Sequence, residues 1–382
     1  MQGEREIYAV IGVNGAGAIS DIYLENMTKR FPTLKVKAVC SRRREKAQKK
    51  AEEYGILAMT WEEMLSDPEI TMIVNLTPAD AHYQIIKEAL LAGKHVFTEK
   101  IMAVTSEEGR EICALADEKH LYLGSAPETF MGSAGQTARR ALDAGVIGDV
   151  GSFHIQANRD LDFLGSLFFS RRAVHGSGIG MDYGVYYLTS LFNLLPPVKR
   201  VCGMIKNPRP VRKNIIPDHP QFGQEYTMAD ETQLYGMLEL VNGICGTIHL
   251  NGDNIAQDEG GLFIYGNKGH LHLPCANFMG NDVELVPISP KWDERAKREI
   301  LKNEFFFTDN ARGIGAADMA CAIHYGCQPR VSKEMAYHVL EVFEGLYKSN
   351  EKGGWVDIHS TFTRPEPMPS VKDVKEERDC FI

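Results

Sequence analysis

The stretch that decides the fold is IYAVIGVNGAGAISDIYLENMTKR, residues 7–30. It begins with an apolar run over 7–13, continues through a glycine-rich loop, and carries a helical pattern over 16–30. A run that is apolar on both faces is typical of a parallel strand buried between helices. The stretch therefore predicts the first strand, loop and helix of an α/β sheet.

Small residues fill the loop between this strand and helix, which reads GAGAIS. Gly15 permits a tight turn, and Gly17 lets the backbone approach a pyrophosphate at the helix N-terminus. Ser20 stands at the third glycine position and is small enough for the helix to pack on the strand. Alone, G-x-G-x-x-S is a glycine-rich turn. Between a strand and a helix it predicts dinucleotide binding, with Ala18 and Ile19 also in contact with the cofactor.

The strand and helix patterns keep alternating up to residue 125. Further apolar runs lie at 34–40, 71–76, 95–98 and 121–124, with helical patterns at 42–54, 80–92 and 106–119 between them. Each helical pattern is long enough to be a crossover between parallel strands. Right-handed crossovers of this kind predict a doubly wound parallel sheet.

After residue 125 strand patterns dominate. They lie at 152–158, 200–206, 232–240, 245–251, 261–265, 270–273 and 283–286, and helical patterns lie at 133–144, 181–194, 311–325 and 333–349. Strands that follow one another without crossover helices predict a mostly antiparallel sheet in an α+β domain. We therefore expect a nucleotide-binding domain over 1–126, a substrate and oligomerisation domain over 127–360, and an extended tail, rich in proline and charge, over 361–382.

Composition narrows the class of protein. The 382 residues carry 42 basic and 51 acidic side chains, a formal charge of −9, which disfavours a broad nucleic-acid-binding face. No apolar run reaches the about 18 residues of a membrane span, and the N-terminus does not resemble a signal peptide. The eight cysteines are scattered without a C-x-x-C pair, which predicts reduced thiols and a cytoplasmic protein.

A basic corner follows the second strand. The sequence AVCSRRREKA places Ser41 where an NAD-binding chain usually has an acid, and Arg42 comes next. Three cations at a helix N-terminus oppose the helix dipole unless an anion binds there. A 2′-phosphate is such an anion, so we expect NADP, with NAD possible. The alternative is a solvated basic helix end.

Two further motifs carry candidate catalytic side chains. In GKHVFTEK, Lys100 stands at the carboxyl end of the fifth strand, the edge at which open α/β sheets bind ligands. In GSGIGMDYGVYYLTSLF, Asp182 and Tyr186 are four residues apart and would share one helix face. Each motif by itself is more often structural than catalytic. The loops 158–175, with His175, and 207–228 are expected to shape the substrate pocket.

Together these segments resemble the glucose-fructose oxidoreductase/inositol dehydrogenase/MocA family. The resemblance covers nearly the whole chain, including T-P-x-x-x-H (Thr77, Pro78, His82), A-G-K-H-V-x-x-E-K ending at Lys100, the turn at Ile147–Val150, D-x-G-x-Y, and the helices RGIGAADMACAI and HVLEVFEGLYKS. It implies a Rossmann domain joined to an α+β domain whose large open sheet packs against another subunit, giving a homodimer or homotetramer.

The resemblance also implies site residues. It places Lys100, Asp182 and Tyr186 around the nicotinamide and adds Thr77, Pro78, His82 and Glu99 to the cofactor contacts, and it implies no metal. Two positions depart from the family pattern. Ile101 replaces the usual proline, and isoleucine could copy a cis geometry there only at a cost of about 3 kcal/mol, so we expect Lys100 to lie slightly differently. Tyr186 stands where many members have histidine, which points to the branch of glucose-fructose oxidoreductase and the dihydrodiol dehydrogenases.

These features predict reversible hydride transfer between NADP and a carbinol carbon of a sugar, polyol or diol. Tyr186 would donate a proton to the substrate carbonyl, Lys100 would stabilise the tyrosinate, and Asp182 would bind a substrate hydroxyl or orient Lys100. Two alternatives stay open, a redox-assisted glycosidase of the same superfamily and a non-catalytic dinucleotide sensor. A metal site at His270, His272 and Cys275 is a weaker candidate, because no further ligand stands at suitable spacing.

Overall fold

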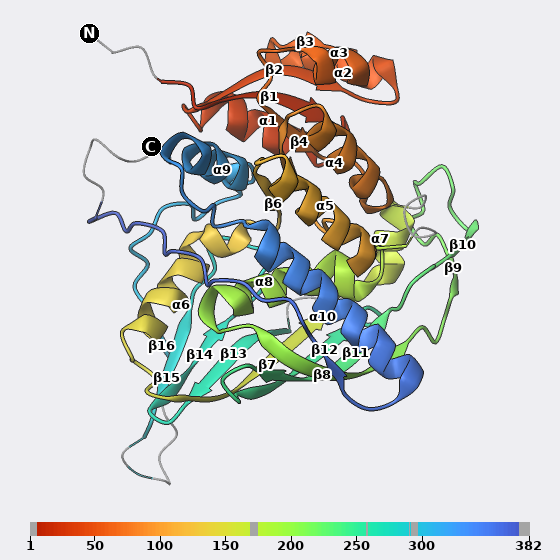
Figure 1. Ribbon diagram of the computed structural model, residues 1–382. Helices are drawn as coiled ribbons and strands as arrows, with labels where there is room; N and C mark the ends of the chain where they lie inside the picture. The colour runs from red at the N-terminus through yellow and green to blue at the C-terminus, as the bar shows by residue number, and fades with distance from the viewer. Residues whose placement is uncertain (1–5, 169–174, 257–258, 290, 292–296, 374–382) are drawn as a thin grey trace. The chain divides into compact units, whose positions relative to one another are not determined.

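The structure is a computed structural model that describes residues 6–168, 175–256, 259–289, 291 and 297–373 (Figure 1). Contacts divide these residues into two compact units. Unit 1 lies within Met1–Glu128, Asn310–Tyr337 and Pro369–Ile382, and unit 2 within Thr129–Asp309 and His338–Met368. The segment Asn310–Tyr337, which the sequence analysis assigned to the second domain, thus groups by its contacts with unit 1.

The described part of unit 1 contains a six-stranded sheet in the order β3-β2-β1-β4-β5-β6. All neighbouring strands are parallel, which confirms the predicted doubly wound sheet. The strands are β1 (Ala9–Asn14), β2 (Leu34–Cys40), β3 (Leu57–Ala58), β4 (Met72–Asn75), β5 (His95–Thr98) and β6 (Leu123–Ser125). Strand order reverses between β1 and β4, and such a reversal is where open α/β sheets bind ligands.

Helices connect these strands as the sequence predicts. They are α1 (Ser20–Lys29), α2 (Arg44–Tyr54), α4 (His82–Leu91) and α5 (Ser106–Glu118), and α9 (Ile314–Tyr325) joins them from the later part of the chain. The short elements β3, α3 (Trp61–Ser66) and η1 (Ala79–Ala81) were not predicted. A capping box between Thr60 and Glu63 starts α3, and this local signal was present in the sequence.

The described part of unit 2 contains a nine-stranded sheet in the order β16-β15-β14-β13-β7-β12-β11-β8-β17. Its strands are β7 (Val150–Asn158), β8 (Val198–Lys206), β11 (Gln233–Leu240), β12 (Cys245–Asn251), β13 (Gly260–Gly266), β14 (Gly269–Leu273), β15 (Glu284–Pro287), β16 (Glu299–Ile300) and β17 (Val356–Asp357). Among these strands β7 and β12 pair in parallel and the other neighbours are antiparallel. The predicted mostly antiparallel sheet is confirmed. A separate hairpin pairs β9 (Val211–Lys213) with β10 (Glu225–Thr227).

Helices cover one face of this sheet. Figure 1 shows α6 (Ser133–Asp143), α8 (Val185–Leu194) and α10 (Lys333–Lys352) on the same side of it. Leu234, Leu238, Ile248 and Leu250 on the inner face are buried, whereas Met237 on the outer face is 48% exposed. This alternation is what one covered face produces. Two further helical elements, α7 (Leu161–Leu167) and η4 (Gly180–Gly184), belong to this unit.

The described part of the predicted tail is extended and lies on its own chain. Residues 361–368 have no regular secondary structure, and Phe362 and Met368 are buried. Arg364 binds Asp143 of α6 at 2.8 Å. The predicted tail residues 374–382 lie outside the described residues. No helix in the described part of the chain is long and apolar enough to cross a membrane.

Candidate active site

The predicted cofactor residues of unit 1 follow four strands that end at one edge of the sheet. Asn14 of β1 is paired with Cys40 of β2 and with Asn75 of β4, and Asn75 is paired with Thr98 of β5. The glycine loop, the Ser41 corner, the Thr77 segment and the Glu99–Lys100 pair begin directly after these four residues. The fold thus brings segments that are up to 85 residues apart to the same edge.

The glycine loop is shaped by close contact with the neighbouring strands. Gly15 has φ +124°, and a Cβ there would lie 2.8 Å from the backbone carbonyl of Leu76. Its N–H donates to Cys40 O at 3.0 Å, and the Ser20 hydroxyl donates to Gly17 O at 2.7 Å. Only glycine fits at position 15, because both the backbone angle and the space exclude a side chain.

The N-terminus of α1 is open to a ligand. Gly17 and Ile19 are partly exposed and Ala18 is exposed, and in the described structure no side chain caps the helix at Ile19. The first N–H groups of a helix lack partners inside it and carry a partial positive charge. This end of α1 has the donors and the field that a pyrophosphate needs.

The basic corner lies between β2 and α2. Arg42, Arg43 and Arg44 are exposed, and Arg42 has no ion-pair partner among the residues that the structure describes. Ser41 is partly buried and its hydroxyl accepts from the Arg43 N–H at 3.4 Å. A cation without a carboxylate partner, next to the glycine-loop edge, can bind an added phosphate.

His82 supports the loops at the sheet edge from inside unit 1. Its ring is fully buried, with Nδ1 2.6 Å from Ile101 O and Nε2 2.8 Å from Thr77 O. Burial lowers the pKa of this imidazole. The ring therefore connects the Thr77–Pro78 segment to the residue after Lys100. The Lys100–Ile101 peptide bond is cis, so isoleucine adopts this geometry, and the expected shift of Lys100 stays a prediction.

Two buried carboxylates, Glu99 and Glu128, interact with each other in unit 1. Glu99 accepts from the Tyr23 hydroxyl at 2.7 Å and from the Lys100 N–H at 3.1 Å. Glu128 accepts from the Gly313 N–H at 2.9 Å, and burial, then the charge of Glu99, raise the pKa of the Glu128 carboxyl. Tyr23 and Glu128 were not predicted from the sequence, because no local pattern connects residues so far apart.

In unit 2 the helix that carries Asp182 and Tyr186 is not α-helical throughout. Asp182 is partly buried in the π-helical turn η4, and Tyr186 is buried in the first turn of α8. The predicted helix therefore contains a π turn, which places more residues in each turn than an α-helix does. Wide turns of this kind are frequent at functional sites.

Aromatic and cationic side chains surround this turn. The Tyr183 hydroxyl lies 3.1 Å from Cys275 Sγ and 3.5 Å from the Tyr187 hydroxyl, and the Arg159 guanidinium lies 4.2 Å from the centre of the Tyr183 ring. Burial raises the pKa values of Tyr183 and Tyr187, so both hydroxyls stay protonated. The rings of Tyr183 and Tyr186 are 6.3 Å apart. Neither Arg159 nor Tyr183 was predicted from the sequence.

An acidic pair precedes β11 and holds the segment before η4. Asp230 accepts from the Ser177 N–H at 3.0 Å and contacts His175 Nδ1 at 2.7 Å, and Glu231 accepts from the Gly180 N–H at 2.8 Å. His175 is exposed. Neither acid was predicted, because their partners lie about 50 residues earlier in the chain.

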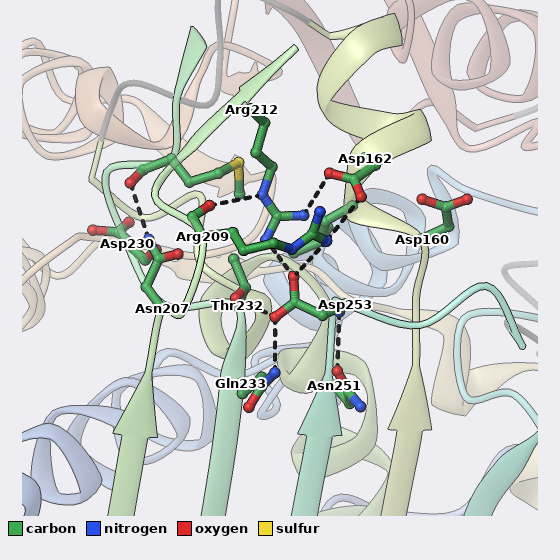
Figure 2. Close-up of polar contacts among 12 residues, drawn as sticks. Asp160, Asp162, Asn207, Arg209, Arg212, Asp230, Thr232, Gln233, Asn251 and Asp253 are labelled. Atoms are coloured by element: carbon green, nitrogen blue, oxygen red, sulfur yellow. Dashed lines mark hydrogen bonds and ion pairs between the residues drawn. The ribbon is translucent and has the colours of Figure 1, made fainter. Parts of the chain in front are cut away.

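A charged cluster connects the described parts of the two predicted pocket loops, 158–175 and 207–228; residues 169–174 lie outside the described residues. Figure 2 shows Arg209 and Arg212 between Asp162 of α7 and Asp253, at one end of the nine-stranded sheet. Arg212 is 1% exposed and binds Asp162 at 2.8 Å. Asp253 also accepts from the Thr232 hydroxyl at 2.8 Å. These ion pairs fix the start of loop 207–228 against the chain around α7.

The weaker metal candidate is built differently from a metal site. His272 contacts Glu284 at 2.9 Å through Nδ1 and Gly260 O at 3.1 Å through Nε2. Cys275 instead contacts Tyr183. Among the described residues no group of three histidine, cysteine or acidic side chains could hold a metal ion.

Two models of protein families match this chain, one for each of the two main parts of the sequence. Residues 8–126 match the model described as "Oxidoreductase family, NAD-binding Rossmann fold", and residues 136–272 match the GFO/IDH/MocA C-terminal domain. The chain belongs to the Gfo/Idh/MocA family. D-glucoside 3-dehydrogenase of Escherichia coli is 28% identical over 361 residues, which cover 91% of this chain and 97% of the relative.

Two further proteins are similar to this Gfo/Idh/MocA chain, one in sequence and one in structure. The NADP-dependent scyllo-inositol 2-dehydrogenase IolW of Bacillus subtilis is 24% identical over 160 residues, covering 42% of this chain and 44% of the relative. Levoglucosan dehydrogenase, solved with NADH and L-sorbose, superposes with a TM-score of 0.79 at 19% identity, covering 92% of this chain and 99% of that one. The family, the fold and an NAD(P)-dependent oxidoreductase activity predicted from the sequence are therefore confirmed. The meeting of Lys100 with Asp182 and Tyr186 stays a prediction.

Proposed function

We propose that the protein catalyses reversible hydride transfer between NADP and a carbinol carbon of a sugar, polyol or diol, with NAD as a possible substitute. The observation that carries the proposal is the sheet edge of unit 1, where Gly15, the uncapped start of α1 and Arg42 follow strands paired to one another. A family relative that aligns over 91% of the chain is a glucoside dehydrogenase, which supports a carbohydrate substrate.

The residues of unit 1 fit a dinucleotide. The start of α1 presents backbone donors for the pyrophosphate, and Gly15 leaves no side chain in its path. Ser41 is neutral and Arg42 is unpaired among the described residues, so both suit a 2′-phosphate. The bound nicotinamide supplies or accepts the hydride. Thr77, Pro78, His82 and Glu99 belong to the same edge, and His82 acts by holding the loops in place.

The protein's own side chains handle the proton. Tyr186 donates it to the developing alkoxide during reduction, and the Lys100 ammonium stabilises the tyrosinate that is left. Asp182 accepts a hydrogen bond from a substrate hydroxyl or orients Lys100. A tyrosine in this role agrees with the branch of glucose-fructose oxidoreductase and dihydrodiol dehydrogenase.

We further propose a homodimer or homotetramer that covers the outer face of the nine-stranded sheet. Met204 and Met237 on neighbouring strands are each 48% exposed there, and exposed apolar surface of this kind marks interaction sites. Sedimentation of the purified protein as a monomer would refute the oligomer.

We also propose a cytoplasmic location. The seven cysteines in the described part of the chain are thiols, which suits the reducing cytoplasm.

The test is a spectrophotometric assay of purified protein. A panel of sugars, polyols and diols is screened with NADP⁺ and NAD⁺ at 340 nm, and Tyr186→Phe and Lys100→Met are compared on the best substrate. We expect turnover with NADP⁺ and losses of about a hundredfold or more in both variants. Bound dinucleotide without turnover would point to a sensor, and product without net reduction to a redox-assisted glycosidase. Either result refutes the proposal.

A further inference from the structure

Four successive backbone N–H groups in front of Asp182 bind the acidic pair Asp230–Glu231. Asp230 Oδ2 accepts from Ser177 at 3.0 Å and from Gly178 at 3.3 Å. The next N–H, at residue 179, donates to the backbone oxygen of Glu231 at 3.1 Å, and the N–H at residue 180 donates to Glu231 Oε1 at 2.8 Å. The turn that begins η4 is therefore held by one dipeptide.

The Glu231 carboxylate explains two glycines of the motif GSGIGMDYG. A Cβ on Gly178 would lie 2.2 Å from Glu231 Oε2, and a Cβ on Gly180 would lie 3.0 Å from Oε1. Neither glycine has a positive φ, so the backbone does not require glycine at these positions. The Glu231 carboxylate fills the space at Gly178, and at Gly180 it shares that space with Phe343 and the Tyr347 hydroxyl, each 3.1 Å from such a Cβ.

The same carboxylate connects η4 to α10. The Tyr347 hydroxyl of α10 donates to Glu231 Oε1 at 3.1 Å, so this oxygen accepts from a helix on one side and from the Gly180 N–H on the other. Glu231 is buried. The Gly178 N–H donates to Asp230. The Gly178 carbonyl accepts a hydrogen bond from the Asp182 N–H at 2.8 Å. Only one residue separates the clamped backbone from Asp182.

We propose that Glu231 is a positioning residue, whose carboxylate, held between Tyr347 and Gly180, sets the position of η4 and thereby of Asp182 and Tyr186. This inference rests on the proposed function of those two side chains. A displacement of about 1 Å at reacting groups can slow an enzyme by about a hundredfold, so a small shift of η4 would be measurable in kcat.

The charge of Glu231 gives the proposal a pH dependence. Burial raises the pKa of its carboxyl to about 7. The Tyr347 hydroxyl stays a neutral donor, because burial and the nearby Glu231 raise its pKa well above the usual value. Among the described residues, the other titratable groups at this place are Asp230 and, bound to it, His175. A hydrogen bond to a carboxylate is roughly twice as strong as one to a neutral acceptor, so η4 is held most firmly above pH 7.

The deciding variant is Glu231→Gln, which keeps an acceptor at Oε1 but removes the charge. We expect its kcat at about pH 8 to fall by tenfold or more with little change in KM, and the rise in kcat between about pH 6 and 8 to flatten. Its melting temperature at about pH 8 should not fall. A raised carboxyl pKa means that stability is lost as the pH rises through 7, and glutamine is free of that loss.

Tyr347→Phe is the second variant, since it removes one donor and leaves the carboxylate. It should lower kcat in the same direction, and the exposed Glu299→Gln on β16 should match the wild type. If Glu231→Gln and Tyr347→Phe keep kcat within about twofold while Asp182→Asn loses it, the positioning role is wrong and the proposed function stands. Full activity in Asp182→Asn and Tyr186→Phe would instead refute the proposed function. If Glu231→Gln has a lower melting temperature at pH 8 and also binds NADPH more weakly in a fluorescence titration, the substitution destabilises the protein in general, and the inference is overturned.

Discussion

Cofactor choice should depend on Arg42, and Arg42→Ala is the perturbation that tests it. The guanidinium is exposed at the end of β2 and has no carboxylate partner among the described residues. A 2′-phosphate would therefore gain a charge-assisted hydrogen bond without breaking an ion pair. Such a bond contributes about 1.5–3 kcal/mol. Because solvent screens an exposed charge, the lower value applies, and about 1.5 kcal/mol corresponds to about tenfold in affinity.

The assay is a competitive fluorescence titration of wild type and variant with NADPH and NADH at fixed ionic strength. Arg42→Ala should weaken NADPH about tenfold and NADH by less than about twofold. Ser41→Asp should shift preference toward NADH, because a carboxylate repels the 2′-phosphate and accepts from a 2′-hydroxyl. Arg44→Ala, at the start of α2, is the matched control, since it removes an equally exposed cation from the same corner. Equal losses of both cofactors in Arg42→Ala would mean that the side chain only stacks on adenine, and the reasoning would be refuted.

Two other substitutions test the structure. Gly15→Ala should abolish dinucleotide binding and lower the melting temperature more than Gly93→Ala, because both glycines have positive φ but only a Cβ at position 15 meets backbone within 4 Å; equal effects would contradict this. Acidification should destabilise unit 2, because burial lowers the pKa of His338 to about 4 and its Nε2 accepts from the Val198 N–H at 2.9 Å. The unfolded chain then binds more protons, so about 3 kcal/mol is lost as the pH falls from about 6.5 to 4. Urea unfolding of His338→Gln should show a shallower pH dependence, and an unchanged slope would refute the assignment.

Patterns among residues that are close in the sequence were enough to predict the sheet of unit 1 and the sheet edge proposed to bind the cofactor. The apolar runs, the helical patterns between them and the glycine loop each lie within a few residues, and parallel pairing then brings the ends of β1, β2, β4 and β5 to one edge. The same logic found most strands of unit 2, because a sheet with one covered face shows a period of two in the sequence. Short elements such as β3 and the hairpin of β9 and β10 were missed, since two or three residues carry too little pattern.

Only the tertiary structure decided how the candidate side chains are supported. The sequence shows GSGIGMDYG as a glycine-rich helix start, but the space at Gly178 is taken by a carboxylate from residue 231, which also crowds Gly180 together with Phe343 and Tyr347. The same holds for Tyr23 with Glu99, and for the change from a regular helix to the π turn at Asp182. Secondary structure follows from side chains that are neighbours in the chain. A buried polar group needs a partner wherever the fold brings one close, so its position depends on the packing of the folded chain.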